Sequence, residues 1–176
     1  MRALTKPELL ALLTAARARS ERDYLMCLVG FWHGLRASEI TRMTADQIRG
    51  GYLTVPRLKG SLKTTQPLIE HADPLLNEKA ALQSFTAAMA AGQRIFPISR
   101  VQFFRIFRKL AAAAGLPEHK RHPHLLKHSI AMQMIKSGAG IENTRQWLGH
   151  RSMSSTGEYL KVSDDEAADS VMGLMK

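Results

Sequence analysis

The sequence predicts a mainly α-helical fold with one small antiparallel β-sheet (α+β). Two features of the chain lead to this fold class. Apolar residues recur at helical spacing over most of the 176 residues, and glycines stand where the helical pattern stops. One stretch, residues 46–71, instead alternates polar and apolar residues around turn signals. Because the length is typical of one domain, we expect residues 1–176 to form a single domain with its own core.

The N-terminal part predicts three helices in succession. Thr5 and Glu8 have the spacing of a capping box, which predicts a helix over residues 6–19. A second helix is expected over residues 23–33, because its apolar run ends at Gly34. The phrase "ASEITRM" directly after it indicates a short third helix.

The rest of the chain predicts the sheet and then further helices. Within residues 46–71, the pairs Gly50-Gly51 and Gly60-Ser61 indicate two turns, and hence about three strands. Helices are expected after them at residues 75–90, 100–114, 125–136, 141–148 and 164–175.

The charge of the chain indicates an anionic partner. There are 25 Lys and Arg against 15 Asp and Glu, a formal net charge of +10, which makes nucleic acid the leading candidate. No apolar run approaches the roughly 20 residues that span a bilayer, and "MRALTKPELL" has no signal-peptide core, so we expect a cytoplasmic protein without a membrane partner. The single cysteine, Cys27, lies in an apolar helical run and is expected in the core.

The segment "HPHLLKHSIA", residues 122–131, concentrates titratable side chains. His124 and His128 would share one helix face, the spacing used by two-histidine metal sites. Lys127 on that helix repels a divalent cation, whereas cationic groups at a helix start suit an anion. A phosphate site is therefore favoured, and a zinc-dependent hydrolase built on His122, His124 and His128 is the alternative.

Four phrases carry a family resemblance, namely "HGLRASEI", "RLKGSLKTTQPL", "HPHLLKHS" and "LGHR", followed by a tyrosine. In these the chain resembles the catalytic domain of the tyrosine recombinases, or phage-integrase family, and in particular the small fimbrial phase-variation DNA invertases. That family has a His-x-x-Arg motif, an "LGH" turn about 26 residues beyond its histidine, and a nucleophilic tyrosine nine further on. Here His124, His150 and Tyr159 stand at these intervals.

The resemblance implies a site-specific DNA recombinase, an integrase or invertase that cleaves and rejoins DNA through a 3′-phosphotyrosine intermediate and needs no metal or other cofactor. It implies double-stranded DNA recombination sites as the partner, self-association on DNA as a dimer or tetramer, and DNA-bending accessory proteins. The catalytic residues that it implies are Arg36, Lys59, His124, Lys127, His150 and Tyr159.

Each of these residues has an expected role. Cationic donors stabilise the charge of the phosphoryl transition state, which is the role of Arg36, Lys127 and His150. Lys59, on the hairpin turn, would protonate the leaving oxygen, and Lys63 on the same turn is its rival. His124 is the candidate base for the phenol of the nucleophile Tyr159. The other tyrosines, Tyr24 and Tyr52, are expected in the core, and His128 is expected to pack within its helix.

Two departures from the family pattern qualify these expectations. The family's second arginine is Lys127 here, which keeps the charge but replaces bidentate geometry by a single mobile ammonium. A DNA-binding regulator with the recombinase fold and reduced or lost catalysis is therefore the alternative function. The chain also starts at the first catalytic-domain helix, so no N-terminal core-binding domain is expected. Residues 164–176 suit a C-terminal docking helix on a neighbouring copy, or one that folds back on its own core.

Overall fold

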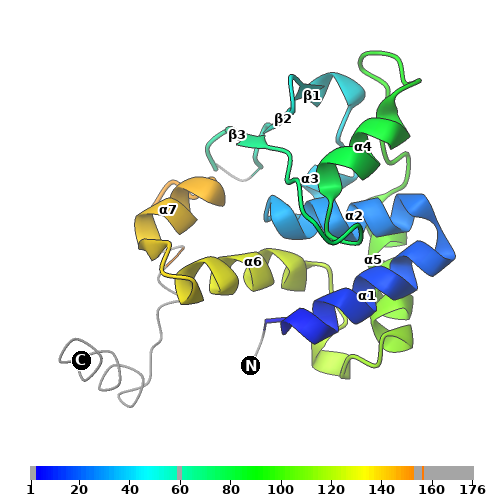
Figure 1. Cartoon of the computed structure of the whole chain (residues 1–176), viewed down its shortest axis with the longest axis vertical. Helices are drawn as coiled ribbons and strands as arrows, with labels where there is room; N and C mark the ends of the chain where they lie inside the picture. Colours follow the sequence, from blue (N-terminus) through cyan, green and yellow to red (C-terminus); the bar gives the residue numbers. More distant parts are fainter. Residues whose placement is uncertain (1–2, 59–60, 153–155, 157–176) are drawn as a thin grey trace.

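The computed structural model describes residues 3–58, 61–152 and 156, and within them it confirms the predicted mainly helical fold with a three-stranded antiparallel sheet (Figure 1). The predicted helix at 164–175 lies outside the described residues. The α-helices are α1 (Lys6–Arg19), α2 (Glu21–Trp32), α3 (Ala37–Ile40), α4 (Glu78–Thr86), α5 (Arg100–Ala113), α6 (His124–Lys136) and α7 (Gly140–Trp147), with short 3₁₀ turns at Ala45–Gln47 and Glu118–Lys120.

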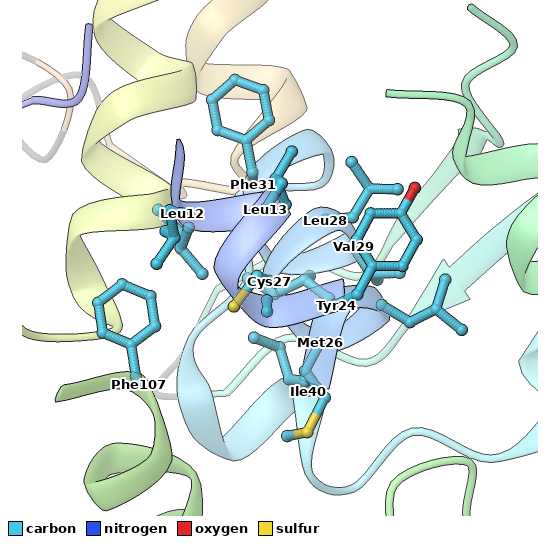
Figure 2. Packing of buried hydrophobic residues seen from close by; sticks show 14 of the residues in the cluster. Leu12, Leu13, Tyr24, Met26, Cys27, Leu28, Val29, Phe31, Ile40 and Phe107 are labelled. Carbon is cyan, nitrogen blue, oxygen red and sulfur yellow. The ribbon is translucent and has the colours of Figure 1, made fainter. Parts of the chain in front are cut away.

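Helix α2 forms the centre of the hydrophobic core. It packs against α1, α4 and α6, and residues 23–31 along it are all buried (Figure 2). Large side chains such as Tyr24 and Phe31 are fully buried, and each such apolar side chain stabilises the fold by about 1.5–3 kcal/mol. Cys27 is fully buried among them, as predicted, and burial, helped by the charge of Asp23, raises the pKa of its thiol.

The capping box that predicted α1 is present. The Thr5 backbone N–H donates to Glu8 Oε2 at 2.8 Å, and the Glu8 N–H donates to Thr5 Oγ1 at 3.3 Å. Helix α4 is shorter than the predicted 75–90, because Asn77 caps it by accepting from the Ala80 N–H at 3.2 Å. The carbonyl of Leu75 before this cap accepts from the Tyr24 hydroxyl instead, so the apolar pattern there belongs to a turn packed on α2.

The sheet has the order β1 (Ile48–Arg49), β2 (Tyr52–Val55) and β3 (Thr64–Pro67), with β1 and β3 both antiparallel to β2. The prediction that Tyr52 is buried is wrong, because its side chain is 51% exposed. Strand β2 buries Leu53 and Val55 on one face, and its period of two therefore turns Tyr52 to the other face.

Glycines allow two turns to meet beside the sheet. Gly34 ends α2 with φ of 58°, and a Cβ there would lie 2.5 Å from Leu148 Cδ2. Gly149 follows α7 with φ of 66°, and a Cβ there would lie 2.7 Å from the Leu62 carbonyl oxygen. Both positions combine a positive φ with close contact, so glycine is required at each. They bring the α2–α3 turn, the β2–β3 hairpin and the end of α7 together.

None of the helices in the described ranges has the length and apolar character needed to cross a membrane.

Candidate active site

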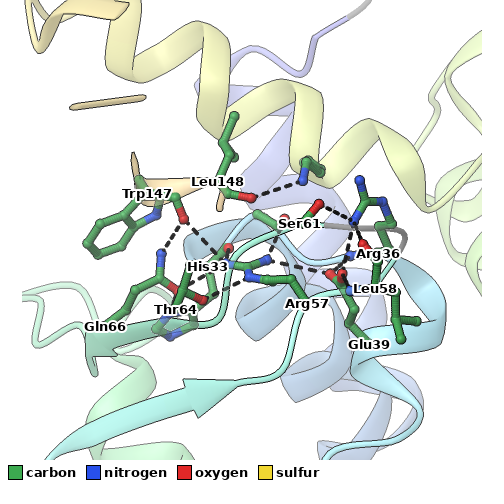
Figure 3. Close-up of polar contacts among 12 residues, drawn as sticks. His33, Arg36, Glu39, Arg57, Leu58, Ser61, Thr64, Gln66, Trp147 and Leu148 are labelled. Carbon is green, nitrogen blue, oxygen red and sulfur yellow. Dashed lines mark hydrogen bonds and ion pairs between the residues drawn. The ribbon is translucent and has the colours of Figure 1, made fainter. Parts of the chain in front are cut away.

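Arg36 lies in the turn between α2 and α3, where it is the residue that precedes the first turn of α3. Its Nη1 donates to Glu39 Oε1 at 3.0 Å, to the Leu58 carbonyl at 3.1 Å and to Ser61 Oγ at 3.3 Å (Figure 3). The side chain remains 24% exposed. The guanidinium is thus oriented by α3 and by the β2–β3 hairpin and still reaches solvent.

Glu39 is the buried carboxylate of the site. It accepts from the backbone N–H groups of Arg36 at 2.8 Å and Leu58 at 3.0 Å, and Arg57 Nη1 lies 3.5 Å from its Oε2. Burial alone would raise the pKa of Glu39. The two backbone hydrogen bonds and the charges of Arg57 and Lys127 outweigh it and lower the pKa, so Glu39 is an anion at neutral pH.

His124 is the first residue of α6 and lies in an exposed position. It lines an open pocket together with Arg36, His122, Arg100 and Phe104. Desolvation by the surrounding protein, followed by the nearby His128 and Lys127, lowers the pKa of His124. Its imidazole is therefore neutral at pH 7 and able to accept a proton.

Lys127 lies one turn further along α6, and its side chain is buried, with 1% of the residue exposed. Its Nζ donates to the Leu148 carbonyl at 3.3 Å. Burial, followed by the positive charges of Arg36 and Arg57, lowers the pKa of Lys127 to about 7, although Glu39 opposes this shift. The lysine is thus held in place and titrates near neutral pH, unlike the mobile ammonium expected from the sequence.

His150 follows the Gly149 turn and is buried, with 7% exposed. Its Nδ1 lies 3.0 Å from Thr156 Oγ1, and its carbonyl accepts from Arg145 Nη1 at 2.8 Å. Burial, followed by the charges of Lys127 and Arg36, lowers the pKa of His150 to about 4. At neutral pH it is an uncharged hydrogen-bonding group.

Four of the six residues predicted for the site are described, and their charges act on one another. Arg36 lowers the pKa of the other three, and Lys127 lowers the pKa of both histidines. Lys59 and Tyr159 lie outside the described residues. Lys63, the rival of Lys59, is exposed immediately before β3, and the choice between these two lysines stays a prediction.

Sequence reasoning missed Glu39 and Arg57. Glu39 stands three residues after Arg36, the spacing at which an acidic side chain reaches back to a helix start, and this signal could have found it. Arg57 gives no comparable signal, because an arginine at the end of a strand in a basic chain is expected at the surface. Its side chain is instead fully buried beside Glu39.

Two basic residues shortly before α6, Lys120 and Arg121, form bonds to other groups of the protein. Lys120 Nζ lies 2.7 Å from Glu8 Oε1 and 2.8 Å from its Oε2, and only 9% of the lysine side chain is exposed. Arg121 Nε donates to the Leu116 carbonyl at 2.8 Å. These two cations fasten the segment before α6 to the start of α1 and to the beginning of the loop that follows α5.

The geometry of the histidines offers the zinc alternative no site in the described part of the chain. His124 and His128 pack edge to face, with 4.4 Å between ring centroids, as expected of a packing histidine. No group of three or more His, Cys, Asp or Glu side chains among the described residues could hold a metal ion.

A mostly helical domain with a three-stranded antiparallel sheet is the catalytic-domain architecture of tyrosine recombinases, which are DNA strand-transfer enzymes. The chain belongs to the phage integrase family, whose model matches residues 2–166.

Individual relatives agree with this membership. The chain is 31% identical over 166 residues to the type 1 fimbriae regulatory protein FimB of Escherichia coli K12, which covers 89% of this chain and 82% of FimB. It is 32% identical over 182 residues to the tyrosine recombinase XerD of Xanthomonas campestris, covering 92% of this chain and 55% of XerD.

A solved structure gives the same fold. The crystal structure of a lambda integrase dimer bound to a COC′ core site aligns with a TM-score of 0.72 and 24% identity, over 92% of this chain and 60% of that chain. The chain spans only a little over half of XerD and of this integrase, whereas it spans most of FimB.

Proposed function

We propose that this chain is a site-specific recombinase that cleaves and rejoins double-stranded DNA through a 3′-phosphotyrosine on Tyr159. The observation that carries the proposal is the convergence of Arg36, His124, Lys127 and His150, from distant parts of the chain, on one site with excess positive charge. Tyr159 stands nine residues beyond His150, at the family's interval.

The cationic cluster suits the transition state of phosphoryl transfer. Attack of a phenolic oxygen on a phosphodiester places extra negative charge on the non-bridging oxygens, and fixed donors stabilise this charge more than that of the ground state. Arg36 retains an exposed edge for these oxygens, and Lys127 and His150 supply further N–H donors. The bond energy stays in the phosphotyrosine link, so the reaction needs no nucleotide cofactor.

Proton transfer is assigned to the remaining groups. The phenol of Tyr159 has an ordinary pKa near 10 and must lose its proton at neutral pH. His124 is neutral there and exposed at the pocket that Arg36 also lines, so it is the proposed base. Lys59, on the β2–β3 hairpin, is the proposed donor of the proton to the leaving 5′-oxygen.

The surface around Arg36 suits the DNA backbone. Two adjoining pockets share Ser38 and Arg100 on their walls, and cationic or histidine side chains line both. Binding of phosphates by these groups would release counterions, so DNA affinity should fall steeply with salt. The lining residues that carry positive charge or an imidazole are Arg36, Arg42, Arg94, Arg100, His122 and His124.

Self-association on DNA forms part of the proposal. The lambda integrase structure holds a dimer on its core site, which supports assembly of this chain as a dimer or tetramer on paired half-sites. We propose that residues 1–176 act as one catalytic domain, that residues 164–176 dock on a neighbouring copy, and that DNA-bending proteins assist.

Lys127 supports a second candidate function. An ammonium cannot reproduce the two parallel donors of an arginine, so a DNA-binding regulator that has lost strand transfer is the competing proposal. The two differ in one product, a covalent protein–DNA adduct.

Covalent capture tests the proposal and selects the DNA site in the same experiment. The protein is mixed with a library of nicked duplexes of randomised sequence, and complexes that survive denaturation are isolated and sequenced. We expect an enriched duplex that forms the adduct with the unaltered chain and with Tyr52→Phe, which alters an exposed tyrosine. Tyr159→Phe should bind the same duplex without forming an adduct. Binding without any adduct by the unaltered chain would support the regulator instead.

A further inference from the structure

Arg57 is a fully buried arginine that lies between β2 and β3, two residues before Lys59. All three of its side-chain nitrogens donate hydrogen bonds (Figure 3). Nε donates to Thr64 Oγ1 at 2.8 Å, Nη1 to the Gly34 carbonyl at 3.1 Å, and Nη2 to the His33 carbonyl at 2.8 Å. Further acceptors are Gln66 Oε1 at 3.3 Å, the Trp147 carbonyl at 3.3 Å and Glu39 Oε2 at 3.5 Å.

These acceptors belong to three segments around the site, namely the α2–α3 turn together with α3, the end of α7 and strand β3. The carbonyls of His33 and Gly34 precede Arg36, and the carbonyl of Trp147 precedes the Gly149 turn and His150. Thr64 belongs to β3, at the other side of the hairpin that bears Lys59. A single guanidinium therefore ties the two turns to the hairpin.

Close packing reinforces this link at Gly149. A Cβ at Gly149 would lie 3.1 Å from Arg57 Cγ, and the Leu62 N–H of the hairpin donates to the Gly149 carbonyl at 2.9 Å. Displacement of Arg57 would therefore be transmitted directly to the turn that precedes His150. Because the Arg57 side chain is fully buried, it cannot itself contact a DNA phosphate.

The charge of Arg57 also faces Lys127. The charged and titratable groups that act on Lys127 are Arg36 and Arg57, which lower its pKa, and Glu39, which raises it; Lys127 in turn lowers the pKa of His124 and His150. Arg36 is partly exposed at the pocket, whereas Arg57 is fully buried and fixed by its hydrogen bonds. Its charge on Lys127 is therefore constant through the reaction.

We propose that Arg57 is a positioning residue for strand transfer, which ties the Arg36 turn, the β2–β3 hairpin and the His150 turn together and adds a fixed positive charge to the surroundings of Lys127. This inference rests on the proposed recombinase function. It assigns to Arg57 an effect on the cleavage step and none on the contact with DNA.

The test compares two substitutions with a matched control. Arg57→Lys keeps the charge but cannot span the acceptors, and Arg57→Gln removes the charge. The control is Arg22→Gln, which removes an arginine that donates to the buried Asp23 with Nε at 3.0 Å and Nη2 at 2.9 Å, at the opposite end of α2. Folding is checked by urea denaturation, and adduct formation is timed on the captured nicked duplex.

At saturating duplex we expect Arg57→Lys to slow adduct formation by about 10- to 100-fold, the effect of misplacing catalytic groups, with duplex affinity within about threefold of the unaltered chain. Arg22→Gln should react at the unaltered rate. Rates of Arg57→Lys within twofold of the unaltered chain would overturn the positioning role, and so would a loss of rate fully explained by lost binding or folding.

A second readout follows the charge of Lys127 in the protein without DNA, by NMR titration of labelled lysine side chains. Removal of a fixed positive charge stabilises the ammonium, so Arg57→Gln should raise the pKa of Lys127, and Arg57→Lys should change it less. At subsaturating duplex, the pH at which adduct formation declines should rise accordingly. An unchanged Lys127 titration would overturn the electrostatic role. A complete lack of adduct with the unaltered chain would instead defeat the proposed function, while the titration still decides whether the charge of Arg57 acts on Lys127.

Discussion

Two buried polar clusters lie side by side at the C-terminal end of α2, and they differ in charge balance. In the first, His33 Nε2 lies 3.0 Å from Glu78 Oε2, and its Nδ1 lies 2.9 Å from Gln66 Oε1. One base there faces one acid. In the second, the cations Arg36, Arg57 and Lys127 surround the single carboxylate of Glu39.

The difference sets the His33 cluster apart from the cluster that we propose is functional. The His33 cluster has one base and one acid, and it joins the end of α2 to β3 and α4. Surplus positive charge in a buried site is costly unless an anion joins it, and the surplus around Glu39 faces the pocket at Arg36. Charge imbalance, more than burial, therefore distinguishes the site at which we propose that a phosphate binds.

The largest expected effect is on stability, when the carboxylate of each cluster is removed in turn. Glu39→Gln leaves the Arg57 guanidinium buried without an anion, and arginine cannot discharge itself by losing a proton. We expect a loss of about 3–5 kcal/mol in the free energy of unfolding, measured by urea denaturation at pH 7.

Glu78→Gln is the matched change in the balanced cluster. The partner of Glu78 is an imidazole and not a guanidinium, so the expected loss is smaller, about 1–3 kcal/mol. Equal losses for the two substitutions would show that the clusters do not differ in the way their charges suggest.

The next effect is on cleavage and concerns Lys127. Lys127→Arg should restore two parallel donors without changing net charge, and one added charge-assisted hydrogen bond in the transition state is worth about 1.5–3 kcal/mol, or roughly 10- to 150-fold in rate. Lys127→Ala should react more slowly than the unaltered chain. Adduct formation on the captured duplex at saturation measures both.

If Lys127→Arg and Lys127→Ala both form the adduct within twofold of the unaltered rate, residue 127 does not take part in binding the phosphate. An arginine variant slower than the unaltered chain would show that the buried site is shaped around the lysine and its bond to the Leu148 carbonyl.

The smallest effect is expected for a cation whose charge is already neutralised. Lys120 is paired with Glu8, so Lys120→Met should lower the free energy of unfolding by about 1 kcal/mol and leave duplex affinity within twofold. Arg100→Met, at the pocket beside Arg36, should weaken binding and reduce its salt dependence. Filter binding over a range of salt concentrations compares the two, and a Lys120 variant that loses as much affinity as the Arg100 variant would refute the distinction.

The sequence predicts local structure well where a short pattern determines it. The capping box at Thr5, the stop at Gly34 and the turn at Gly50-Gly51 each rest on neighbouring residues, and the structure confirms them. The exposure of Tyr52 was missed, because strand alternation does not say which face is covered.

The site was predictable only in part for a related reason. Arg36, His124, Lys127 and His150 come from spaced phrases that resemble a family. The burial of Lys127 and Arg57 depends instead on contacts such as that of Arg57 with the Trp147 carbonyl, between residues 90 positions apart. No window of sequence contains both partners of such a contact.

The same contacts have a consequence for the order of folding. Helices α1 and α2 pack together and follow one another directly, whereas the hydrogen bonds from the Trp147 indole to the Trp32 carbonyl and from Arg57 to the Trp147 carbonyl close loops of 115 and 90 residues. Closure of long loops is entropically costly and comes late, after local structure has formed. During synthesis on the ribosome, the α1–α2 part of the hydrophobic core can therefore form while the proposed phosphate site is still open, and that site is completed only when α7 has emerged and docked.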